Sequence, residues 1–166
     1  MISRKKRPGN ALETLRRLHK SCRLQCITTS YRRGRCARVL PADKTVCIDC
    51  DKCSCFGPDA RKPDFIILYA RSQKSLSYWF IVEMKTTAVH PRDITNQSQA
   101  GVNAIDSCPS FQLSISMGLI LPIVLHQGGI HADDFGILRK QRISFHAEPI
   151  EINLQRCGTR LDRLLG

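Results

Sequence analysis

Three ionisable residues interrupt two apolar stretches of the chain in a pattern that could do chemistry. Asp64 begins the apolar run "DFIILYA", and Glu83 and Lys85 end the run "LSYWFIVEMK". Two carboxylates held close together repel each other unless a proton or a cation lies between them. Mg²⁺ prefers such oxygen ligands and keeps waters and phosphate oxygens as its remaining ligands, while a neighbouring ammonium can act on a metal-bound water. Together these groups could hydrolyse a phosphodiester bond.

A β-hairpin is the element that must bring them together. The polar segment "RSQKS" joins the two apolar runs, so we expect antiparallel strands on either side of it. A turn centred near Lys74 pairs residues whose numbers sum to about 148, and Asp64 then falls opposite Glu83 or Met84. Glu83 and Lys85 are two residues apart and point to the same face of their strand. In a purely structural interpretation Asp64 caps a strand start and Glu83–Lys85 is a surface ion pair, but the apolar "YWFIV" before Glu83 favours a site.

Other elements are expected on both sides of this hairpin. "NALETLRRLHKSC" has the periodicity of a helix that begins at Asn10, and "PRDITNQSQAGVNAID" predicts a second helix. The inner stripe of the second helix is expected to contain Ile94, Ser98, Gly101, Val102 and Ile105. "MGLILPIVLH" predicts a buried strand, "FGILRKQRISFHA" and "PIEINL" predict later strands in an edge hairpin, and "GTRLDRLL" predicts a short closing helix. This order of elements predicts an α/β fold with a mixed central sheet flanked by helices.

The chain of 166 residues is expected to form one domain with a substantial core. Residues 1–9 are predicted to be a basic disordered tail, and residues 10–166 a single domain with a cysteine-rich insertion at about 36–58. Residues 47–63, which are rich in Cys, Asp, Gly and Pro, are expected to form a loop. No apolar stretch reaches the roughly 18 residues that a membrane span needs, so no membrane association is expected.

The sequence Pro63-Asp64, eighteen further residues and Glu83-Met84-Lys85 resembles the motif of the PD-(D/E)xK nuclease superfamily. This superfamily includes restriction endonucleases, archaeal Holliday-junction resolvases and RecB-type nucleases. The resemblance implies a restriction endonuclease-like core in which Asp64 and Glu83 bind Mg²⁺ (or Mn²⁺) and Lys85 serves the attacking water. The implied activity is metal-dependent hydrolysis of DNA by an endonuclease of the resolvase, restriction or repair type.

The same resemblance implies two further site residues. In such families an acidic residue on the first helix often supports the metal site, and Glu13 is the acidic residue on that helix here. The helix after the E-x-K strand often carries a Gln followed four residues later by Gly. Gln97 and Gly101 have this spacing, and Gln99 is a rival. Both Glu13 and Gln97 also have a purely structural interpretation. Glu13 at N3 could close a capping box, and Gln97 could be an ordinary polar residue of a helix.

Positive charge is concentrated at the start of the chain. Residues 1–38 hold twelve Lys and Arg residues and one acid, whereas the remaining 128 residues hold fourteen basic and thirteen acidic side chains. A field of one sign attracts polyanions, and nucleic acid is the commonest of these inside cells. The residues expected to contact the phosphate backbone are Arg16, Arg17, Lys20, Arg32, Arg33 and Arg35. DNA is the expected partner, with RNA kept as an alternative. A solubilising tail would cover "SRKKR" but not the later Arg pairs, and an organelle-targeting peptide would not run straight into a helical pattern.

Nine cysteines are an unusual number for a chain of this length. The four with the closest spacing are Cys47, Cys50, Cys53 and Cys55. Their thiolates could converge on one Zn²⁺ ion. The second option is an iron–sulfur cluster, since the arrangement of the cysteines resembles that of some RecB-type nucleases. The alternative is a loop of reduced thiols. A disulfide framework is not expected, because the number is odd and the protein is expected to be intracellular, and Cys108 and Cys157 are interpreted as buried thiols.

These observations predict an intracellular Mg²⁺-dependent endodeoxyribonuclease of the cytoplasm and nucleoid, or of the nucleus or an organelle in a eukaryote. One domain of this size presents a single active site, so cutting both strands of a duplex would favour a two-fold homodimer. The alternative prediction is a non-enzymatic nucleic-acid-binding protein with a cysteine-bound structural metal, Zn²⁺ or iron–sulfur. His90 could contact a substrate phosphate, whereas His126 and His131 have no partner that the sequence identifies.

Overall fold

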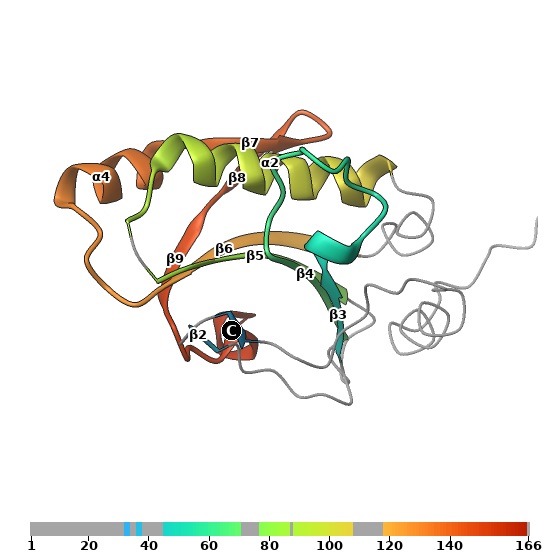
Figure 1. Ribbon diagram of the computed structural model, residues 1–166, viewed down its shortest axis with the longest axis horizontal. Helices are drawn as coiled ribbons and strands as arrows, with labels where there is room; N and C mark the ends of the chain where they lie inside the picture. The colour runs from blue at the N-terminus through green and yellow to red at the C-terminus, as the bar shows by residue number, and fades with distance from the viewer. Residues whose placement is uncertain are drawn as a thin grey trace, which may run out of the picture.

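The computed structural model describes residues 45–70, 77–86, 88–107 and 118–165, together with the backbone of residues 32–33 and 36–37. Its centre is a five-stranded sheet with the spatial order β3-β4-β5-β6-β9 (Figure 1). The strands of this sheet are β3 (Thr45–Asp49), β4 (Phe65–Ala70), β5 (Ser77–Lys85), β6 (Gly118–His126) and β9 (Asn153–Arg156). β3, β4 and β5 are antiparallel to one another in turn, whereas β5, β6 and β9 are parallel, so the sheet is mixed.

Helices and short strands cover both faces of this sheet. The other elements are β1 (Arg32–Arg33), β2 (Cys36–Ala37), η2 (Cys50–Lys52), α2 (Pro91–Ser107), α4 (Ala132–Lys140), β7 (Arg142–Phe145), β8 (Glu148–Glu151) and η4 (Leu161–Leu165). In Figure 1, α2, α4 and the β7–β8 ribbon lie above the sheet, and η4 and β2 lie below it. The predicted α/β class with a mixed central sheet and flanking helices is confirmed. Within the described ranges, no helix is long and apolar enough to cross a membrane.

The alternation of side chains along the strands divides the core into two parts, one on each face of the sheet. On β5, Trp79 and Ile81 point to the face that carries α2, whereas Phe80 and Val82 point to the opposite face. Both sides of the central strands are buried, which explains why β4, β5 and β6 are almost continuously apolar. A charged residue in such a strand is costly unless it is paired or hydrogen-bonded.

β4 and β5 form the predicted antiparallel hairpin. Phe65 pairs with Val82, so the numbers of paired residues sum to 147, within one residue of the expected register. One position beyond this ladder, Asp64 lies opposite Glu83, and the two residues are joined by a hydrogen bond. The hairpin therefore places the two carboxylates at one end of the two central strands.

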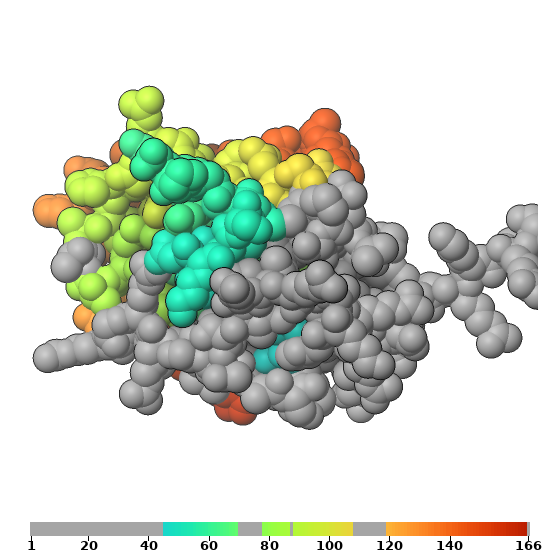
Figure 2. All heavy atoms as spheres, turned by 45° about the vertical axis from the view of Figure 1, so that its right-hand side comes forward, coloured from blue at the N-terminus to red at the C-terminus, as the bar shows by residue number. Residues whose placement is uncertain are grey.

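Helix α2 packs on the sheet through the predicted stripe. Its buried residues are Ile94, Ser98, Gly101, Val102, Ala104 and Ile105, which include all five expected positions. Gly101 makes the closest approach, because a Cβ atom there would lie 2.6 Å from Ile81 Cγ2 and 3.1 Å from Pro63 Cγ. A side chain at this position would push the helix away from β5 and from the residue that precedes Asp64. In Figure 2, residues 50–63 (cyan to green) lie directly against α2 (light green to yellow).

The segment after β6 differs from the prediction. Residues 132–140 form helix α4 rather than a strand, and only the four residues of β7 are extended in the segment predicted as a strand. α4 has two acidic residues in its first turn and two basic residues in its last turn, which favours a helix in this direction. The run "PIEINL" is split at the buried Ile152, because β8 pairs with β7 whereas β9 joins the main sheet beside β6. The predicted closing helix is present as the 3-10 helix η4.

The cysteine-rich segment also differs from the prediction. The sequence predicts a loop from Cys47, but Cys47 belongs to β3, an edge strand of the central sheet. Pairing with β4 explains the difference, because Val46, Cys47 and Ile48 are buried between that strand and the two halves of the core. The loop between β3 and β4, residues 50–64, therefore begins three residues later than predicted.

Candidate active site

Asp64 lies immediately before β4 and is 7% exposed. Its Oδ2 accepts a 2.7 Å hydrogen bond from the backbone N–H of Met84, and its own N–H donates a 3.2 Å hydrogen bond to Oε2 of Glu83. These two bonds continue the β4–β5 ladder where its backbone pairing ends. The carbonyl of Asp64 accepts a further bond, 3.1 Å long, from the N–H of Cys50 at the other end of the β3–β4 loop. Bonds to two neighbouring segments thus fix this residue.

Glu83 is 3% exposed and lies, like Lys85, on the face of the sheet that carries α2. Lys85 Nζ lies 2.6 Å from Glu83 Oε1, while the lysine side chain remains 23% exposed. Burial, and then the charge of Asp64, raise the pKa of Glu83 from 4.5 to about 7, while the hydrogen bond and the charge of Lys85 oppose this shift. Glu83 therefore changes its protonation state near neutral pH, and a cation between the two carboxylates would hold it ionised.

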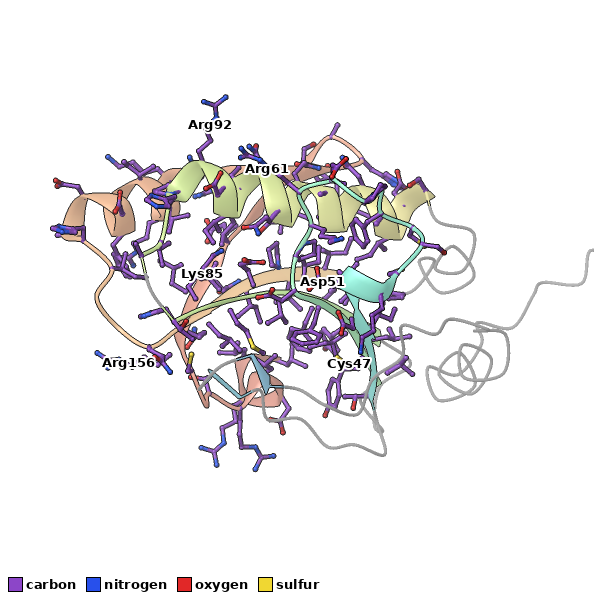
Figure 3. All side chains as sticks on the ribbon, in the orientation of Figure 1. Cys47, Asp51, Arg61, Lys85, Arg92 and Arg156 are labelled. Atoms are coloured by element: carbon purple, nitrogen blue, oxygen red, sulfur yellow. The ribbon has the colours of Figure 1, made fainter. Side chains whose placement is uncertain are left out.

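A pocket of about 430 Å³, the carboxylate pocket, lies beside these three residues. It is lined by Asp51, Ala60, Arg61, Lys62, Asp64, Glu83, Met84, Lys85, Thr86 and Gln97. In Figure 3, the labelled Lys85 and Asp51 lie at the level between the sheet and α2, and Arg61 lies beside α2 itself. The volume falls in the range of about 300–1,000 Å³ that is usual for ligand sites, so it can hold a phosphate group with a hydrated ion.

Gln97 reaches the carboxylate pocket from α2, one turn before Gly101. Its Oε1 is buried and has no hydrogen-bond partner within the described part of the chain, which is costly unless a ligand or water binds it. Gln99, the rival, is bound elsewhere, because its side chain forms hydrogen bonds with Asn103 and with the backbone of Ser144. The structure therefore brings Gln97, and not Gln99, to the carboxylates.

Sequence reasoning does not single out five residues of the pocket wall, which are Asp51, Ala60, Arg61, Lys62 and Thr86. Arg61 and Lys62 come from the β3–β4 loop, where Arg61 forms an ion pair with Asp93 of α2, and Lys62 lies 3.7 Å from Asp51. Thr86 follows the end of β5. The available signal for the basic pair is its position, since it directly precedes the Pro-Asp dipeptide. The fold places both basic side chains at the rim of the pocket, where Arg61 pairs with Asp93 and Lys62 pairs with Asp51.

The donor set of the carboxylate pocket fits a hard divalent cation. Carboxylate and amide oxygens are ligands that Mg²⁺ and Mn²⁺ prefer, and Asp64, Glu83 and Gln97 line one pocket. The buried amide oxygen of Gln97 is an acceptor that such an ion, or a water bound to it, would satisfy. In the described ranges no three His, Cys, Asp or Glu side chains form a metal site, so waters and phosphate oxygens would complete the coordination shell.

Several predicted site residues lie outside the described part of the chain. They are Glu13, Arg16, Arg17, Lys20 and Arg35, together with the predicted tail at 1–9 and the predicted first helix. For Arg32 and Arg33 the backbone alone is described, as strand β1. The interaction of this basic quarter with nucleic acid therefore stays a prediction. His90 and His131 are exposed just before α2 and α4, and neither lines the carboxylate pocket.

The four cysteines of the predicted metal site are not gathered at one place. Cys47 packs on the face of the sheet opposite α2, whereas Cys50 and Cys53 pack in the core on the α2 side. Cys55 is disulfide-bonded and cannot act as a thiolate ligand. Burial, followed by the charges of Cys53 and Cys47, raises the pKa of the Cys50 thiol. The four cysteines are therefore divided between the two halves of the core, and a metal shared by them stays a prediction.

The disulfides correct a further expectation. Cys55 and Cys157 are disulfide-bonded, whereas the sequence predicts a thiol or a thiolate at each position. An odd number of cysteines argues against a complete framework of bridges but not against individual bridges, and Cys47, Cys50 and Cys53 are thiols in the same chain. Spacing along the chain does not determine which sulfur atoms meet in space, so the prediction could not separate these cases.

Comparison of the chain with known protein families, with curated proteins and with solved structures finds no match. The candidate site is therefore interpreted from its own geometry. Two buried carboxylates, a lysine bound to one of them and a buried amide oxygen line one pocket, whose wall also carries Arg61 and Lys62. The resemblance to the PD-(D/E)xK motif stays a prediction that this geometry leaves open.

Proposed function

We propose that the protein is a divalent-metal-dependent nuclease that hydrolyses phosphodiester bonds of DNA as an endonuclease. The observation that carries the proposal is the meeting of Asp64, Glu83 and Lys85 at one pocket. An ion pair with a purely structural role would not need a second buried carboxylate, since the charge of Asp64 makes Glu83 harder to ionise. Like charges that raise a pKa inside a pocket are typical of functional sites.

Each residue has a distinct role in this proposal. The carboxylates of Asp64 and Glu83 would hold Mg²⁺ or Mn²⁺, which supplies an activated water and neutralises charge on the phosphate. Lys85 is bound to Glu83 Oε1 and is still partly exposed, so its ammonium would orient the attacking water and stabilise negative charge that develops on the phosphate. Gln97 would accept a hydrogen bond or bind the ion through its buried amide oxygen.

The surroundings of the carboxylate pocket suit a phosphodiester backbone. Arg61 and Lys62 line the pocket, and both side chains keep part of their surface in solvent. The net charge of +12 and the basic first quarter of the chain would attract DNA over a longer range. Because phosphate contacts release counterions, the affinity for DNA should fall steeply as the salt concentration rises.

Cleavage of supercoiled, branched and linear DNA in Mg²⁺, Mn²⁺ or EDTA tests the proposal. The wild-type protein should cut only with metal, and Glu83→Gln, which is nearly isosteric but cannot ionise, should be slower by at least about 10²-fold. Glu148→Gln, at an exposed position of β8, is the matched control and should cut like the wild type. Equal cutting by Glu83→Gln and the wild type would contradict the assignment. The preferred substrate distinguishes resolvase, restriction and repair activities.

A second candidate function is nucleic-acid binding without catalysis. The observation in its favour is that Asp64 and Glu83 each form a hydrogen bond with the backbone of the other strand, so both could serve to join β4 to β5. In that case no metal would promote cutting, while DNA or RNA would bind in a salt-sensitive manner. Zinc or iron in the purified protein, measured by elemental analysis, would support a cysteine-bound structural metal in this second function.

A two-fold homodimer is the assembly we propose for cutting both strands of a duplex. The described part of one chain contains one carboxylate pocket, so a single copy would need two successive events. Sedimentation velocity with and without a DNA duplex measures the assembly. A monomer that linearises plasmid without a nicked intermediate would contradict this part of the proposal.

A further inference from the structure

Lys85 is the first member of a row of polar side chains across the carboxyl ends of three parallel strands. In the β5–β6 register Lys85 pairs with His126, and in the β6–β9 register His126 pairs with Arg156. Paired residues of neighbouring parallel strands point to the same face, which here is the face that carries α2. Figure 3 shows Lys85 and Arg156 at the same end of the sheet. We call Lys85, His126 and Arg156 the basic row.

Backbone hydrogen bonds hold this row beyond the ends of the strands. The N–H of Gln127 donates a 3.3 Å bond to the last carbonyl of β5, and the N–H of Cys157 donates a 2.8 Å bond to the carbonyl of His126. The chain then turns at Gly128, whose φ is 115°. A Cβ atom at Gly128 would lie 4.0 Å from Nη1 of Arg156, so the guanidinium lies beside this turn and next to β6.

A second pocket, of about 380 Å³, lies at the far part of the basic row. Its lining consists of His126, Gln127, Arg156 and Cys157. It neighbours the carboxylate pocket, because Lys85 lines that pocket and its strand partner His126 lines this one. Nδ1 of His126 is buried and has no hydrogen-bond partner among the described residues. Arg156 is exposed and forms no ion pair with any residue in the described ranges.

The chemistry of this second pocket suits a phosphate group. Burial and the charge of Arg156 lower the pKa of His126, so the imidazole is neutral at pH 7 and offers an N–H, while Arg156 supplies the charge. No carboxylate lines the pocket. Neighbouring strands lie about 5 Å apart, so the backbone of Arg156 is about 10 Å from that of Lys85. Along the helix axis one DNA strand carries a phosphate about every 3.4 Å, and because the strand winds around this axis its phosphates are further apart in space, so a phosphate one or two steps from the scissile one could lie there.

We propose that His126, Gln127 and Arg156 bind a backbone phosphate of the DNA strand whose scissile phosphate lies in the carboxylate pocket. The choice of DNA as the ligand rests on the proposed function. The basic row would then guide the strand along the carboxyl edge of the sheet, from β5 across β6 to β9. A flanking phosphate held there fixes the position of the scissile phosphate relative to Glu83 and Lys85.

Binding of a short DNA duplex in EDTA measures this site without cleavage. Arg156→Gln should weaken binding on the order of tenfold and reduce the slope of log affinity against log salt by about one. Arg156→Lys keeps the charge and should keep the slope, although it loses the planar fork of the guanidinium. Arg163→Gln is the matched control, since Arg163 is an exposed arginine of η4 on the opposite face of the sheet, and it should bind like the wild type.

Substrates with one neutral methylphosphonate linkage locate the contact. Cleavage by the wild type should slow when one particular flanking linkage is neutral, and Arg156→Gln should show no additional slowing at that linkage, because the two changes remove the same contact. His126→Ala, which removes the N–H donor of the neutral imidazole, should reproduce part of the effect. Identical linkage profiles for the wild type and Arg156→Gln would overturn the proposal.

The outcomes separate this inference from the proposed function. If the slope of log affinity against log salt is the same for Arg156→Gln and the wild type, the phosphate site is overturned, whether or not the protein cuts DNA. A reduced slope in a protein that cuts no DNA supports the phosphate site and contradicts the nuclease. A wild-type protein without salt-sensitive DNA binding overturns both.

Discussion

At the scale of single residues, the surroundings of Glu83 decide its chemistry. Its carboxyl is almost fully buried, faces a second carboxyl and is bound by one ammonium. The hydrogen bond from the N–H of Asp64 fixes one oxygen, and Lys85 occupies the other. The side chain is therefore held in one orientation, but its ionised form is still destabilised. A cation beside the two carboxylates would stabilise that ionised form without any change of orientation.

Glu83 should make the metal-free protein less stable as the pH rises. Its pKa is about 7 in the folded chain against 4.5 ordinarily, so the folded state binds more protons in this window and the free energy of unfolding falls as the pH rises through it. Relative to Glu83→Gln, the wild type should lose on the order of 2 to 3 kcal/mol between pH 4.5 and pH 8. Urea unfolding of both proteins in EDTA across this range measures the difference, with Glu148→Gln as the control. Parallel pH profiles for the wild type and Glu83→Gln would show that Glu83 is not perturbed.

Lys85→Ala should abolish cleavage while DNA binding largely remains. The substitution removes the ammonium that lies 2.6 Å from Glu83 Oε1, and we expect cleavage to slow by about 10² to 10⁴-fold. Affinity for DNA in EDTA should fall by no more than about tenfold, the effect of one phosphate contact. Lys140→Ala, at an exposed position at the end of α4, is the control. A loss of binding as large as the loss of cleavage would assign Lys85 to substrate affinity instead.

At the scale of the elements, helix α2 sets the depth of the carboxylate pocket. Gly101 lets the helix lie against β5 and against Pro63, and Gln97 one turn earlier then reaches the pocket. The β3–β4 loop forms the facing wall and is joined to the same helix by the ion pair between Arg61 and Asp93. The site is thus assembled from a hairpin end, a helix and a loop, each of which contacts the other two.

Gly101→Ala should destabilise the protein even though alanine favours helices. Its Cβ would lie 2.6 Å from Ile81 Cγ2, so the helix must move or β5 must distort, at a cost of about 1 to 3 kcal/mol. Gly136→Ala in α4 is the matched control, because its Cβ would meet no atom within 4 Å, and it should stabilise the chain by up to about 1 kcal/mol. Urea unfolding compares the two. Stabilisation by both substitutions would show that α2 does not pack this closely.

The sequence predicts the elements whose pattern is local. The β4–β5 hairpin follows from two apolar runs and a polar turn, and the buried stripe of α2 follows from its helical periodicity. α4 is short and has apolar residues that also suit a strand, so its helical state depends on packing through Leu138. β3 becomes a strand only because β4 offers it a partner, which no pattern within "TVCID" reveals.

The candidate site is predictable to a similar degree. Asp64, Glu83 and Lys85 are conspicuous because a charge in an apolar strand is costly, and their grouping follows from the hairpin register. The rim residues Arg61 and Lys62 are ordinary loop residues in the sequence and gain their position from the path of the loop over α2. The paired registers that create the basic row join three strands that are far apart in the chain.

At the scale of the whole molecule, covalent bridges lie on both sides of the sheet. Cys55 packs against the core on the α2 side, and Cys157 packs against the core on the opposite side. Both are disulfide-bonded. A bridge restricts the unfolded chain, so these two residues should contribute to stability beyond the packing that surrounds them.

Reduction should therefore lower the stability of the protein. We expect a loss on the order of 2 to 4 kcal/mol per bridge on addition of dithiothreitol, seen as a lower melting temperature by circular dichroism. In the double variant Cys55→Ser, Cys157→Ser the reductant should have a much smaller effect. A melting temperature of the wild type that does not respond to reductant would contradict the bridges.

The β3–β4 loop returns to its own starting point, since the N–H of Cys50 donates to the carbonyl of Asp64 over 3.1 Å. The two ends of this loop adjoin, so a shorter connection could join the same two strands. The entropy lost on closing a loop depends only weakly on its length, so such a change alters this part of the free energy of folding little. The pairing of Asp49 with Phe65 fixes the strands independently of the loop's length. Exchanging residues 51–62 for a short turn should therefore keep the pairing of β3 with β4, lose the stability contributed by Cys53 and by the Cys55 bridge, and leave the carboxylates open to bulk water on one side. Strand pairing and the enclosure of the carboxylates would then be encoded by different parts of the chain, divided at this loop.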